Sequence, residues 1–382
     1  MEVASFHLMP WPKAGNNVAW PYSEAEFDPE LGSEVYENYL EQLAYCEDLG
    51  FDSIGLNEHH YTAYGLMPNP SVTASNLIER TDDIEIAIMG NILPIRGNPI
   101  RVAEEMAMLD TLSEGRMLSG FVRGIPTEYA AFGINPSESR DRFAEAWDLV
   151  TKAWTAEEPF DWEGEYWEYD DVYIWPRPYQ DPHPPLWMPS ESQKSIEFAA
   201  ERQVPTGNIY VDTQTIAEGF DHYRQVAREK YNWEPTEEYF WLPRMTYVAE
   251  TMEQAREEAE EHLEYFYDTL FGGLYRAGVQ SELMEDDRGG YREEESFDYA
   301  DHAPEKGAKA MNFDFDELQE SGEIIVGTPE YVTEEIERQY EEVGGFSRFV
   351  GLFQFGSLPH DLTIKNHELF ADEVMPEIRK LN

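Results

Sequence analysis

The chain has 382 residues, of which 41% are hydrophobic and 14% aromatic, a composition that excludes a disordered protein and supplies enough apolar residues for a large core. Its 78 acidic residues outnumber its 27 basic ones and give a formal net charge of -51, so nucleic acid would be repelled. Because the acidic residues occur along the whole chain, we expect a salt-adapted organism, in whose cytosol the Debye length falls to about 3 Å.

The single cysteine, Cys46, excludes a disulfide framework. The N-terminal sequence MEVASFHLMP lacks the basic region and apolar run of a signal peptide, and no stretch of the chain is apolar enough to span a membrane. We therefore expect a cytoplasmic protein with no membrane segment. The length fits one barrel domain over residues 1–382, since such barrels often exceed 250 residues when they carry insertions.

The first part of the chain alternates strand and helix patterns, with a loop over Pro10–Gly32 and another from Gly124 to Ser137. Helices are expected over Ser33–Leu49, from Pro70 to about Arg80, and from Pro99 to about Leu112. The expected strands are Glu2–Met9, Phe51–Leu56, Ile84–Leu93 and Arg116–Val122.

The second part begins with an amphipathic helix over Ser139–Trp154 and an excursion over residues 156–184, in which Trp162–Ile174 alternates like a β-hairpin. Three more strands, each followed by a helical pattern, are expected at Leu186–Pro189, Val204–Tyr210 and Phe240–Ala249. Residues 283–320 are polar and punctuated by glycine, and a structureless loop of this length predicts either a lid or a disordered insert.

Arg348–Phe355 supplies an eighth strand, and Thr363–Ile378 a closing helix. Eight strands alternating with helices predict an α/β protein with a (β/α)8 TIM barrel; a doubly wound open sheet is the alternative. The carboxyl ends of the strands would then carry the active site.

Two adjacent histidines follow the second strand in the stretch NEHHYTAYGLMPNP, residues 57–70. His59 and His60 would lie on opposite faces of a strand end, so only one can point into a barrel mouth. A histidine there can take up or donate a proton near neutral pH. A purely structural pair is the first alternative, and a metal site is the second, although the other histidines lack ligand spacing.

Cations and helix starts follow the fourth and fifth strands. Arg123 ends the fourth strand and Arg140 opens the next helix, which in an anionic protein favours a phosphate site, since arginine pairs bidentately with phosphate oxygens. Pairing with the abundant carboxylates is the alternative. Ser190–Ser192 predicts a helix N-cap that is compatible with phosphate binding, whereas Thr328–Glu330 predicts a cap only, because Glu330 would repel phosphate.

Several motifs, taken together and in order, resemble the bacterial luciferase-like flavin monooxygenases, most closely the group containing the luciferase alpha subunit. They are NEHHYTAYGLMPNP, NPIRVAEEMAMLDTLSEGRMLSGFVRG, NPSESRDRF, WPRPYQDPHPPLWMPSES, VGTPEYV and VMPEI. The resemblance implies an α/β barrel that binds reduced FMN at its carboxyl rim and activates dioxygen as a flavin hydroperoxide. It also implies a separate reductase that supplies the reduced FMN, and a homodimer or higher oligomer.

Carried over by position, the resemblance implies that His59 is the catalytic histidine and Tyr210 part of the substrate wall. The implied cofactor-binding residues are Asn91, Arg123, Arg140, Glu191, Ser192 and, with a weaker match, Ser195. No metal is implied. Three departures stand out. Val122 replaces the reactive cysteine of luciferase, and Tyr210 stands where luciferase has an aromatic of its pocket, which suggests a different substrate wall. Whether the Ile88–Asn91 stretch holds a non-prolyl cis peptide is left open.

The leading hypothesis is a two-component, reduced-FMN-dependent monooxygenase that oxygenates an aliphatic or other apolar substrate, such as an aldehyde, with residues 283–320 closing as a lid. A deazaflavin-dependent hydride-transfer enzyme on the same barrel is the second hypothesis. A non-catalytic flavin-binding subunit is the third.

Overall fold

The structure, a computed structural model, describes residues 1–14, 27–273 and 313–381, and its centre is a curled nine-stranded sheet. Every pairing in this sheet is parallel, in the order β10-β9-β11-β1-β2-β3-β4-β7-β8. The strands are β1 (Glu2–His7), β2 (Ser53–Leu56), β3 (Glu85–Ile92), β4 (Met117–Val122), β7 (Leu186–Pro189), β8 (Thr206–Gly207), β9 (Trp241–Val248), β10 (Ile324–Gly327) and β11 (Arg348–Leu352).

A parallel bridge between Thr206 and Phe240 joins β8 to the residue just before β9 and so brings the two ends of the sheet together. The prediction of an α/β fold with a barrel-like sheet is therefore confirmed. The alternative, an open doubly wound sheet, is wrong. The described sheet has nine strands rather than eight because β10 pairs with the second half of β9. The run Ile-Ile-Val-Gly that forms β10 is too short to predict a strand by periodicity.

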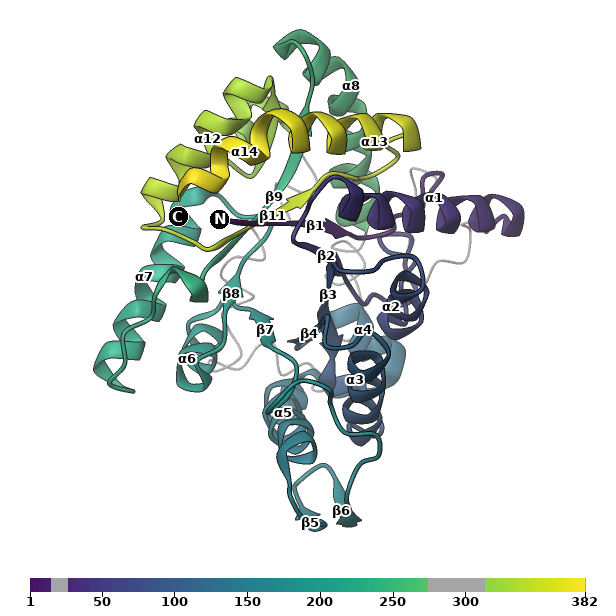
Figure 1. Cartoon of the computed structure of the whole chain (residues 1–382), viewed down its shortest axis with the longest axis vertical. Coiled ribbons are helices and arrows are strands. Elements are labelled where there is room, and N and C mark those ends of the chain that lie inside the picture. The colour runs from purple at the N-terminus through teal and green to yellow at the C-terminus, as the bar shows by residue number, and fades with distance from the viewer. Residues whose placement is uncertain (15–26, 274–312, 382) are drawn as a thin grey trace.

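Helices surround the sheet, with α1, α2, α3, α6, α7, α12 and α13 outside the strands in Figure 1. The longer helices are α1 (Pro29–Asp48), α2 (Pro70–Ile78), α3 (Ile100–Leu112), α4 (Pro126–Phe132), α5 (Ser139–Thr155), α6 (Gln193–Arg202), α7 (Thr213–Glu229), α8 (Met252–Glu264), α11 (Phe315–Glu320), α12 (Pro329–Glu342), α13 (His360–Leu369) and α14 (Met375–Ile378). Short turns of helix are η1 (Leu93–Ile95), η2 (Pro136–Glu138), η3 (Glu237–Tyr239), η4 (Tyr265–Phe271), η6 (Phe370–Val374) and η7 (Arg379–Leu381).

The barrel interior is filled by a small apolar cluster, as expected for inward-facing residues on alternate strand positions. Its largest members are Trp187 and Trp241, whose rings stack with centroids 5.6 Å apart. At the amino end of the barrel Arg348 lies over the ring of Trp241 and pairs with Glu85 at 2.6 Å. Packing and ion pairs therefore hold the strands together at this end.

Two predicted loops contain helix that the sequence reading missed. The Pro10–Gly32 loop ends early because α1 begins at Pro29, where the Asp28 carboxylate caps the helix by accepting the Glu30 N–H at 2.9 Å. The loop before Ser137 contains α4, which begins at Pro126, a residue that suits the first turn of a helix. The missed helix α4 matters because it carries a residue of the candidate site.

The predicted hairpin is present as β5 (Phe160–Glu163) and β6 (Glu168–Val172), an antiparallel pair that forms its own two-stranded sheet. In Figure 1 it projects beyond α5, away from the barrel strands. The predicted lid over residues 283–320 falls mostly outside the described residues. Its end is not a loop, since α11 forms over Phe315–Glu320 with Asp314 as its N-cap.

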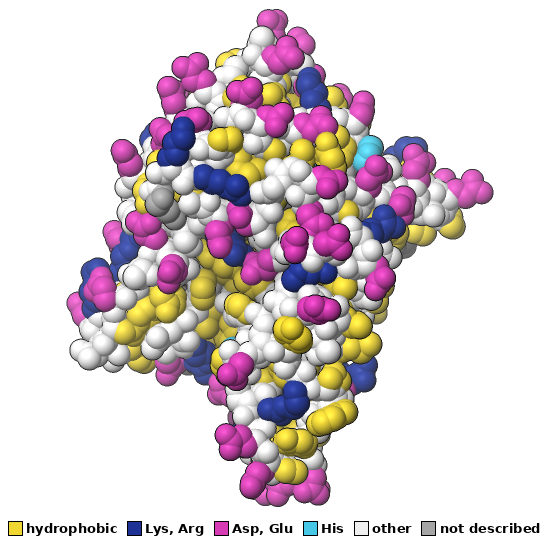
Figure 2. Space-filling view, in the orientation of Figure 1, with side chains coloured by type: hydrophobic (Ala, Val, Ile, Leu, Met, Phe, Trp, Pro, Cys, Tyr) yellow, Lys and Arg dark blue, Asp and Glu magenta, His cyan; other side chains and the backbone are white. Residues whose placement is uncertain are grey.

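Acidic side chains are spread over the whole face of the molecule shown in Figure 2, with few basic ones between them. Among the described residues, no helix is both long and apolar enough to cross a lipid bilayer. The same residues contain no cluster of three or more histidine, cysteine, aspartate or glutamate side chains arranged to hold a metal ion.

Candidate active site

The carboxyl end of β2 leads into the histidine-containing stretch, and Glu58 ties this end to the next strand. The Glu58 carboxylate is fully buried and accepts hydrogen bonds from the Ile92 N–H at 2.8 Å and from Arg96 Nη2 at 2.7 Å. It also contacts His60 Nε2 at 2.8 Å. A buried carboxylate is stable only when its oxygens are paired in this way. Glu58 and His60 therefore form a supporting network behind the rim.

His59 pairs instead with α4. Its Nδ1 lies 2.9 Å from Glu128 Oε1, and the other carboxylate oxygen of Glu128 accepts the Ile125 N–H at 2.9 Å. The carboxylate makes Nδ1 the protonated ring nitrogen, so Nε2 carries the lone pair. Nε2 has no hydrogen-bond partner among the described residues, and the side chain is 19% exposed. This is the geometry of a histidine ready to accept a proton.

An aromatic wall adjoins His59. The ring of Tyr64 meets the His59 ring edge to face at 4.8 Å, and the Tyr64 hydroxyl donates to the Tyr210 hydroxyl at 2.9 Å. Tyr210 in turn contacts Phe271 at 5.1 Å between centroids, and Phe266 lies against both tyrosines. Burial raises the pKa of Tyr64 and of Tyr210, so both hydroxyls stay neutral. The structure thus links Tyr210 to His59 through Tyr64.

Buried polar atoms without partners gather at the ends of β2 and β3. Both side-chain amide atoms of Asn57 and the Nδ2 of Asn91 are buried and make no hydrogen bond to the described residues. A Cβ on Gly65 would lie 3.3 Å from Asn57 Nδ2 and 3.5 Å from the Cβ of His59, so these groups are close neighbours. Native proteins satisfy nearly all buried polar groups, so such atoms indicate a polar ligand.

The strand that carries Asn91 has an irregular end. The Met89–Gly90 peptide bond is cis, which answers the question that the sequence left open. The register between β3 and β4 shifts between Ile88 and Asn91. A Cβ on Gly90 would lie 2.4 Å from the carbonyl carbon of Gly120, so the two backbones approach too closely for any side chain at this position.

The predicted phosphate residues follow β4 and β7, which are paired neighbours. Arg123 directly follows β4, and its guanidinium has no hydrogen-bond or ion-pair partner within residues 1–14, 27–273 and 313–381. Arg140 lies in the first turn of α5. Because carboxyl ends of parallel neighbours meet at one edge of a sheet, Arg123 lies at the same edge as the start of α6.

The start of α6 is capped as predicted. Ser192 Oγ accepts the Ser195 N–H at 3.1 Å, and Ser195 Oγ accepts the Ser192 N–H at 3.0 Å. Ser195 Oγ also accepts the Glu191 N–H at 3.2 Å. The predicted cap at Thr328 is present too, with its side chain accepting the Tyr331 N–H. Whether the α6 cap binds phosphate stays a prediction.

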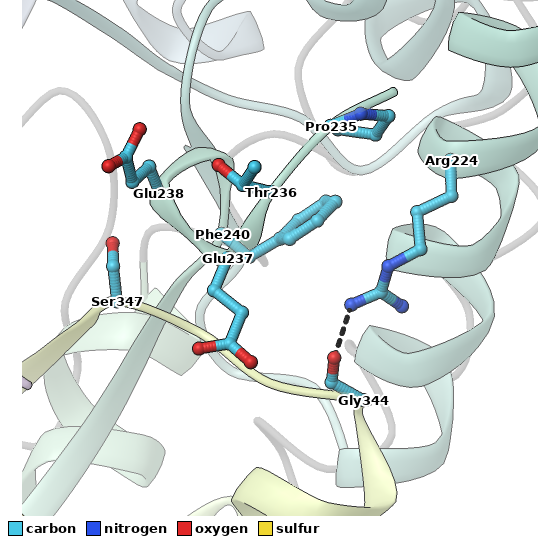
Figure 3. A pocket seen from close by; sticks show the side chains of 8 residues that line it. All are labelled: Arg224, Pro235, Thr236, Glu237, Glu238, Phe240, Gly344 and Ser347. Carbon is cyan, nitrogen blue, oxygen red and sulfur yellow. Dashed lines mark hydrogen bonds between the residues drawn. The ribbon is translucent and has the colours of Figure 1, made fainter. Parts of the chain in front are cut away.

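A different pocket lies at the opposite end of the barrel, next to the residues that precede β9 and β11 (Figure 3). Its arginine, Arg224, donates to the carbonyl oxygens of Val343 and Gly344, and its guanidinium lies over the Phe240 ring. Glu237 accepts the Tyr340 hydroxyl. The charged groups of this pocket are thus engaged in contacts that stabilise the fold. We therefore take the carboxyl rim as the candidate site.

The family model of the luciferase-like monooxygenases matches residues 18–346 of the chain. The chain belongs to the luciferase-like monooxygenase family. The family and enzyme class that the sequence motifs predict are therefore confirmed.

Curated relatives of this luciferase-like chain include flavin enzymes that it matches over much of its length. The alkanal monooxygenase alpha chain of the Kryptophanaron alfredi symbiont is 26% identical over 368 residues, covering 95% of this chain and 98% of that one. The oxygenase component of flavin-dependent trigonelline monooxygenase from Acinetobacter baylyi is 25% identical over 260 residues, covering 67% of this chain and 70% of that one.

Solved structures share the fold. Monooxygenase RslO1 from Streptomyces bottropensis superposes with a TM-score of 0.75 at 25% identity, covering 99% of this chain and 100% of that one. The oxygenating constituent of 3,6-diketocamphane monooxygenase from Pseudomonas putida, in complex with FMN, gives 0.75 at 20% identity, with coverage of 99% and 98%. An F420-dependent secondary alcohol dehydrogenase gives 0.70 at 19%, with 99% of each chain covered. The diketocamphane monooxygenase and the alcohol dehydrogenase are too distant in sequence to show more than a shared fold.

Several residues of the candidate site were not among the predicted site residues, among them Tyr64 and Phe271 of the aromatic wall and the polar residues Glu128, Arg96 and Asn57. Glu128 was missed because it lies 69 residues after His59 and on a helix that was read as loop. A proline at the first helical position, Pro126, followed by Glu128 in the first turn, is a signal from which this helix start could have been predicted. Arg96 and Asn57 carry no pattern that separates them from ordinary loop residues.

Proposed function

We propose that this luciferase-like chain is the oxygenase of a two-component system, which uses reduced FMN and dioxygen to oxygenate an aliphatic or other apolar substrate. The observation that carries the proposal is His59, with Nδ1 held by the Glu128 carboxylate and Nε2 free, beside an aromatic wall at the carboxyl rim. The names of two relatives, an alkanal monooxygenase and a flavin-dependent trigonelline monooxygenase, support the same chemistry. We propose further that a separate reductase delivers the reduced flavin.

The residues at the rim fit a flavin. The unpartnered amide of Asn57 and the unpartnered Nδ2 of Asn91 suit the polar edge of a heterocycle, and the guanidinium of Arg123, which has no partner among the described residues, suits a phosphate. Arg140, Ser192 and their neighbours at the starts of α5 and α6 complete the proposed phosphate site. When bound, reduced FMN supplies the electrons that activate dioxygen.

The protein's own contribution is proton handling and enclosure. Glu128 holds the Nδ1–H of His59, so Nε2 is the atom that accepts a proton from the substrate side and later returns it. The aromatic wall of Tyr64, Tyr210 and Phe271 excludes water from this place. Neutral tyrosine hydroxyls leave the wall uncharged, which suits an apolar substrate such as a straight-chain alkanal.

The decisive variant is His59→Ala. We expect substrate oxidation to slow by about 100-fold or more, because a positioned acid–base group contributes that much, while FMN still binds. Stopped-flow traces with photoreduced FMN, dioxygen and a straight-chain alkanal measure the rate, and flavin fluorescence measures binding. Turnover at the wild-type rate would remove His59 from the mechanism.

A deazaflavin-dependent hydride-transfer enzyme is the second candidate, favoured by the shared fold of the F420-dependent alcohol dehydrogenase. The two candidates differ in the use of dioxygen. Oxygen uptake measured with photoreduced FMN and with photoreduced deazaflavin separates them: the monooxygenase consumes oxygen with FMN in proportion to product, whereas the hydride-transfer enzyme forms product without oxygen. A non-catalytic subunit is disfavoured because it has no need of a paired His59 and Glu128.

A further inference from the structure

A second pocket, of about 590 Å³, lies behind the rim, on the side of His60 rather than His59. It is bounded by the loop after η1, the end of α4, α5 and the turn of the β5–β6 hairpin. None of the residues proposed to bind FMN lines it. Its volume falls in the range of pockets that hold small organic ligands.

The pocket lining is cationic and aromatic in a chain whose net charge is -51. Two arginines, Arg96 and Arg142, line it together with His60, while Phe132 and Trp167 belong to its apolar part. No aspartate or glutamate of the described residues is among the lining side chains. The two arginines of this pocket can therefore attract an anion, which the acidic remainder of the surface would repel.

Both guanidiniums are fixed in place and keep free donors. Arg142 donates from Nε to Glu138 at 2.9 Å and lies 4.4 Å from the ring centroid of Tyr166, so its terminal nitrogens, which have no partner in the described parts of the chain, remain available. Arg96 uses Nη2 for Glu58, while its buried Nε is unpartnered. A planar guanidinium with free N–H groups matches a carboxylate.

We propose that this pocket is a second ligand site, for a small aromatic carboxylate. The carboxylate pairs with Arg142 and Arg96, and the ring packs against Phe132 and Trp167. None of the residues proposed to bind FMN lines this pocket, so it binds the acid whether or not a flavin is present. Arg96 is shared with the rim, where its Nη2 donates to Glu58 and Asn91, whereas Arg142 belongs to this pocket alone.

The test uses the full-length protein and 4-fluorobenzoate as the probe. We expect its ¹⁹F NMR signal to broaden on addition of protein, and Arg142→Gln to weaken binding by about tenfold or more, since a charge-assisted pair is lost. Arg101→Gln is the matched control, because it removes an arginine that makes comparable helix ion pairs on an exposed surface. Equal broadening by wild type and Arg142→Gln would overturn the proposal.

A blocking variant keeps the test valid if Arg142→Gln perturbs the fold. Gly97 lines the pocket, and a Cβ added there meets nothing within 4 Å, so Gly97→Phe fills the pocket from an open position. We expect Gly97→Phe to abolish binding and Gly97→Ala to retain it, with equal melting temperatures. Displacement of the probe by FMN, or equal binding of uncharged 4-fluorobenzamide, would also overturn the proposal.

Discussion

Glu128 decides which nitrogen of His59 can take up a proton. The carboxylate accepts the Nδ1–H at 2.9 Å and is itself held by the Ile125 N–H, so the imidazole is fixed in one tautomer. Because both oxygens of Glu128 are engaged by His59 and the Ile125 N–H, we propose that it is a positioning residue that acts through His59. Its effect must then appear in the chemical step rather than in flavin affinity.

We expect Glu128→Gln to lower the rate of substrate oxidation by about 10- to 100-fold, which is the usual effect of removing a carboxylate that orients a working histidine. The pH dependence of the rate should shift as well, because the imidazolium loses its stabilising charge. Stopped-flow rates over a pH series measure both. A variant with unchanged pH profile and unchanged rate would show that the pair is structural only. Glu128→Asp, which keeps the charge, should recover part of the rate.

The guanidinium of Arg123 is the second feature at the residue scale that can be tested. Its guanidinium has no partner among the described residues, so replacing it removes no internal ion pair and should leave the fold intact. We expect Arg123→Ala to weaken FMN binding by roughly 1.5 to 3 kcal/mol, the size of a charge-assisted hydrogen bond. A fluorescence titration measures this. Arg101→Ala, on the exposed face of α3, is the control, and equal affinities of the two variants would sink the assignment.

The site residues that the sequence predicts are those that follow a strand pattern directly, and their roles stay predictions. His59, Arg123 and Ser192 follow strand patterns, and the capping role of Ser192 is confirmed. Partners remote in sequence could not be predicted, because no local pattern pairs Glu128 with His59. The same holds for Arg96, which reaches back to Glu58 across 38 residues.

At the scale of elements, α4 positions the site, and one glycine fixes where it begins. Gly124 has a φ of +91°, and a Cβ there would lie 2.6 Å from Ile92 Cγ2 and 2.9 Å from Glu128 Oε2. The C-cap of the same helix, Gly133, also has a positive φ, of 67°, but a Cβ there meets nothing within 4 Å. A side chain at Gly133 would therefore cause backbone strain only, whereas a side chain at Gly124 would cause both strain and a steric clash.

We expect Gly133→Ala to cost about 1 to 2 kcal/mol of unfolding free energy from strain alone. Gly124→Ala should cost more, about 2 kcal/mol or above, because overpacking adds to the strain. It should also slow substrate oxidation, since it displaces the Glu128 carboxylate. Urea unfolding and stopped-flow rates test both effects. Equal losses of stability with unchanged activity in both variants would contradict this account of α4.

Elements with strong periodicity were predictable, and short ones were not. The strand at Leu186–Pro189, the helix from Ser139 and the hairpin were all found where the pattern predicts them. In contrast, α4 has only seven residues, and β10 has four that directly precede the Thr328 helix cap, so neither was separated from the loop beside it. Their structure depends on packing against β3 and β9, which only the folded chain supplies.

At the scale of the whole molecule, charge balance decides how salt acts. With 78 acidic and 27 basic residues, pairing every Lys and Arg with one carboxylate leaves 78 − 27 = 51 carboxylates unpaired. Salt weakens exposed ion pairs such as Arg101–Glu104, but these contribute only about 0 to 1 kcal/mol each. It also screens the repulsion among the unpaired carboxylates spread over the surface (Figure 2). The second effect involves more charges, so salt should stabilise the protein.

We therefore expect the melting temperature to rise by at least about 5 °C, or roughly 4 kcal/mol for a chain of this length, between 0.1 M and 2 M KCl. The rise should be steepest below 1 M, where the Debye length shortens from about 10 Å to about 3 Å, because screening is nearly complete beyond that. Sucrose stabilises proteins by exclusion without screening charge, and it should raise the melting temperature without this early steep phase. A flat or falling melting temperature in KCl would show that local ion pairs outweigh the net charge, and would remove the physical basis for salt adaptation.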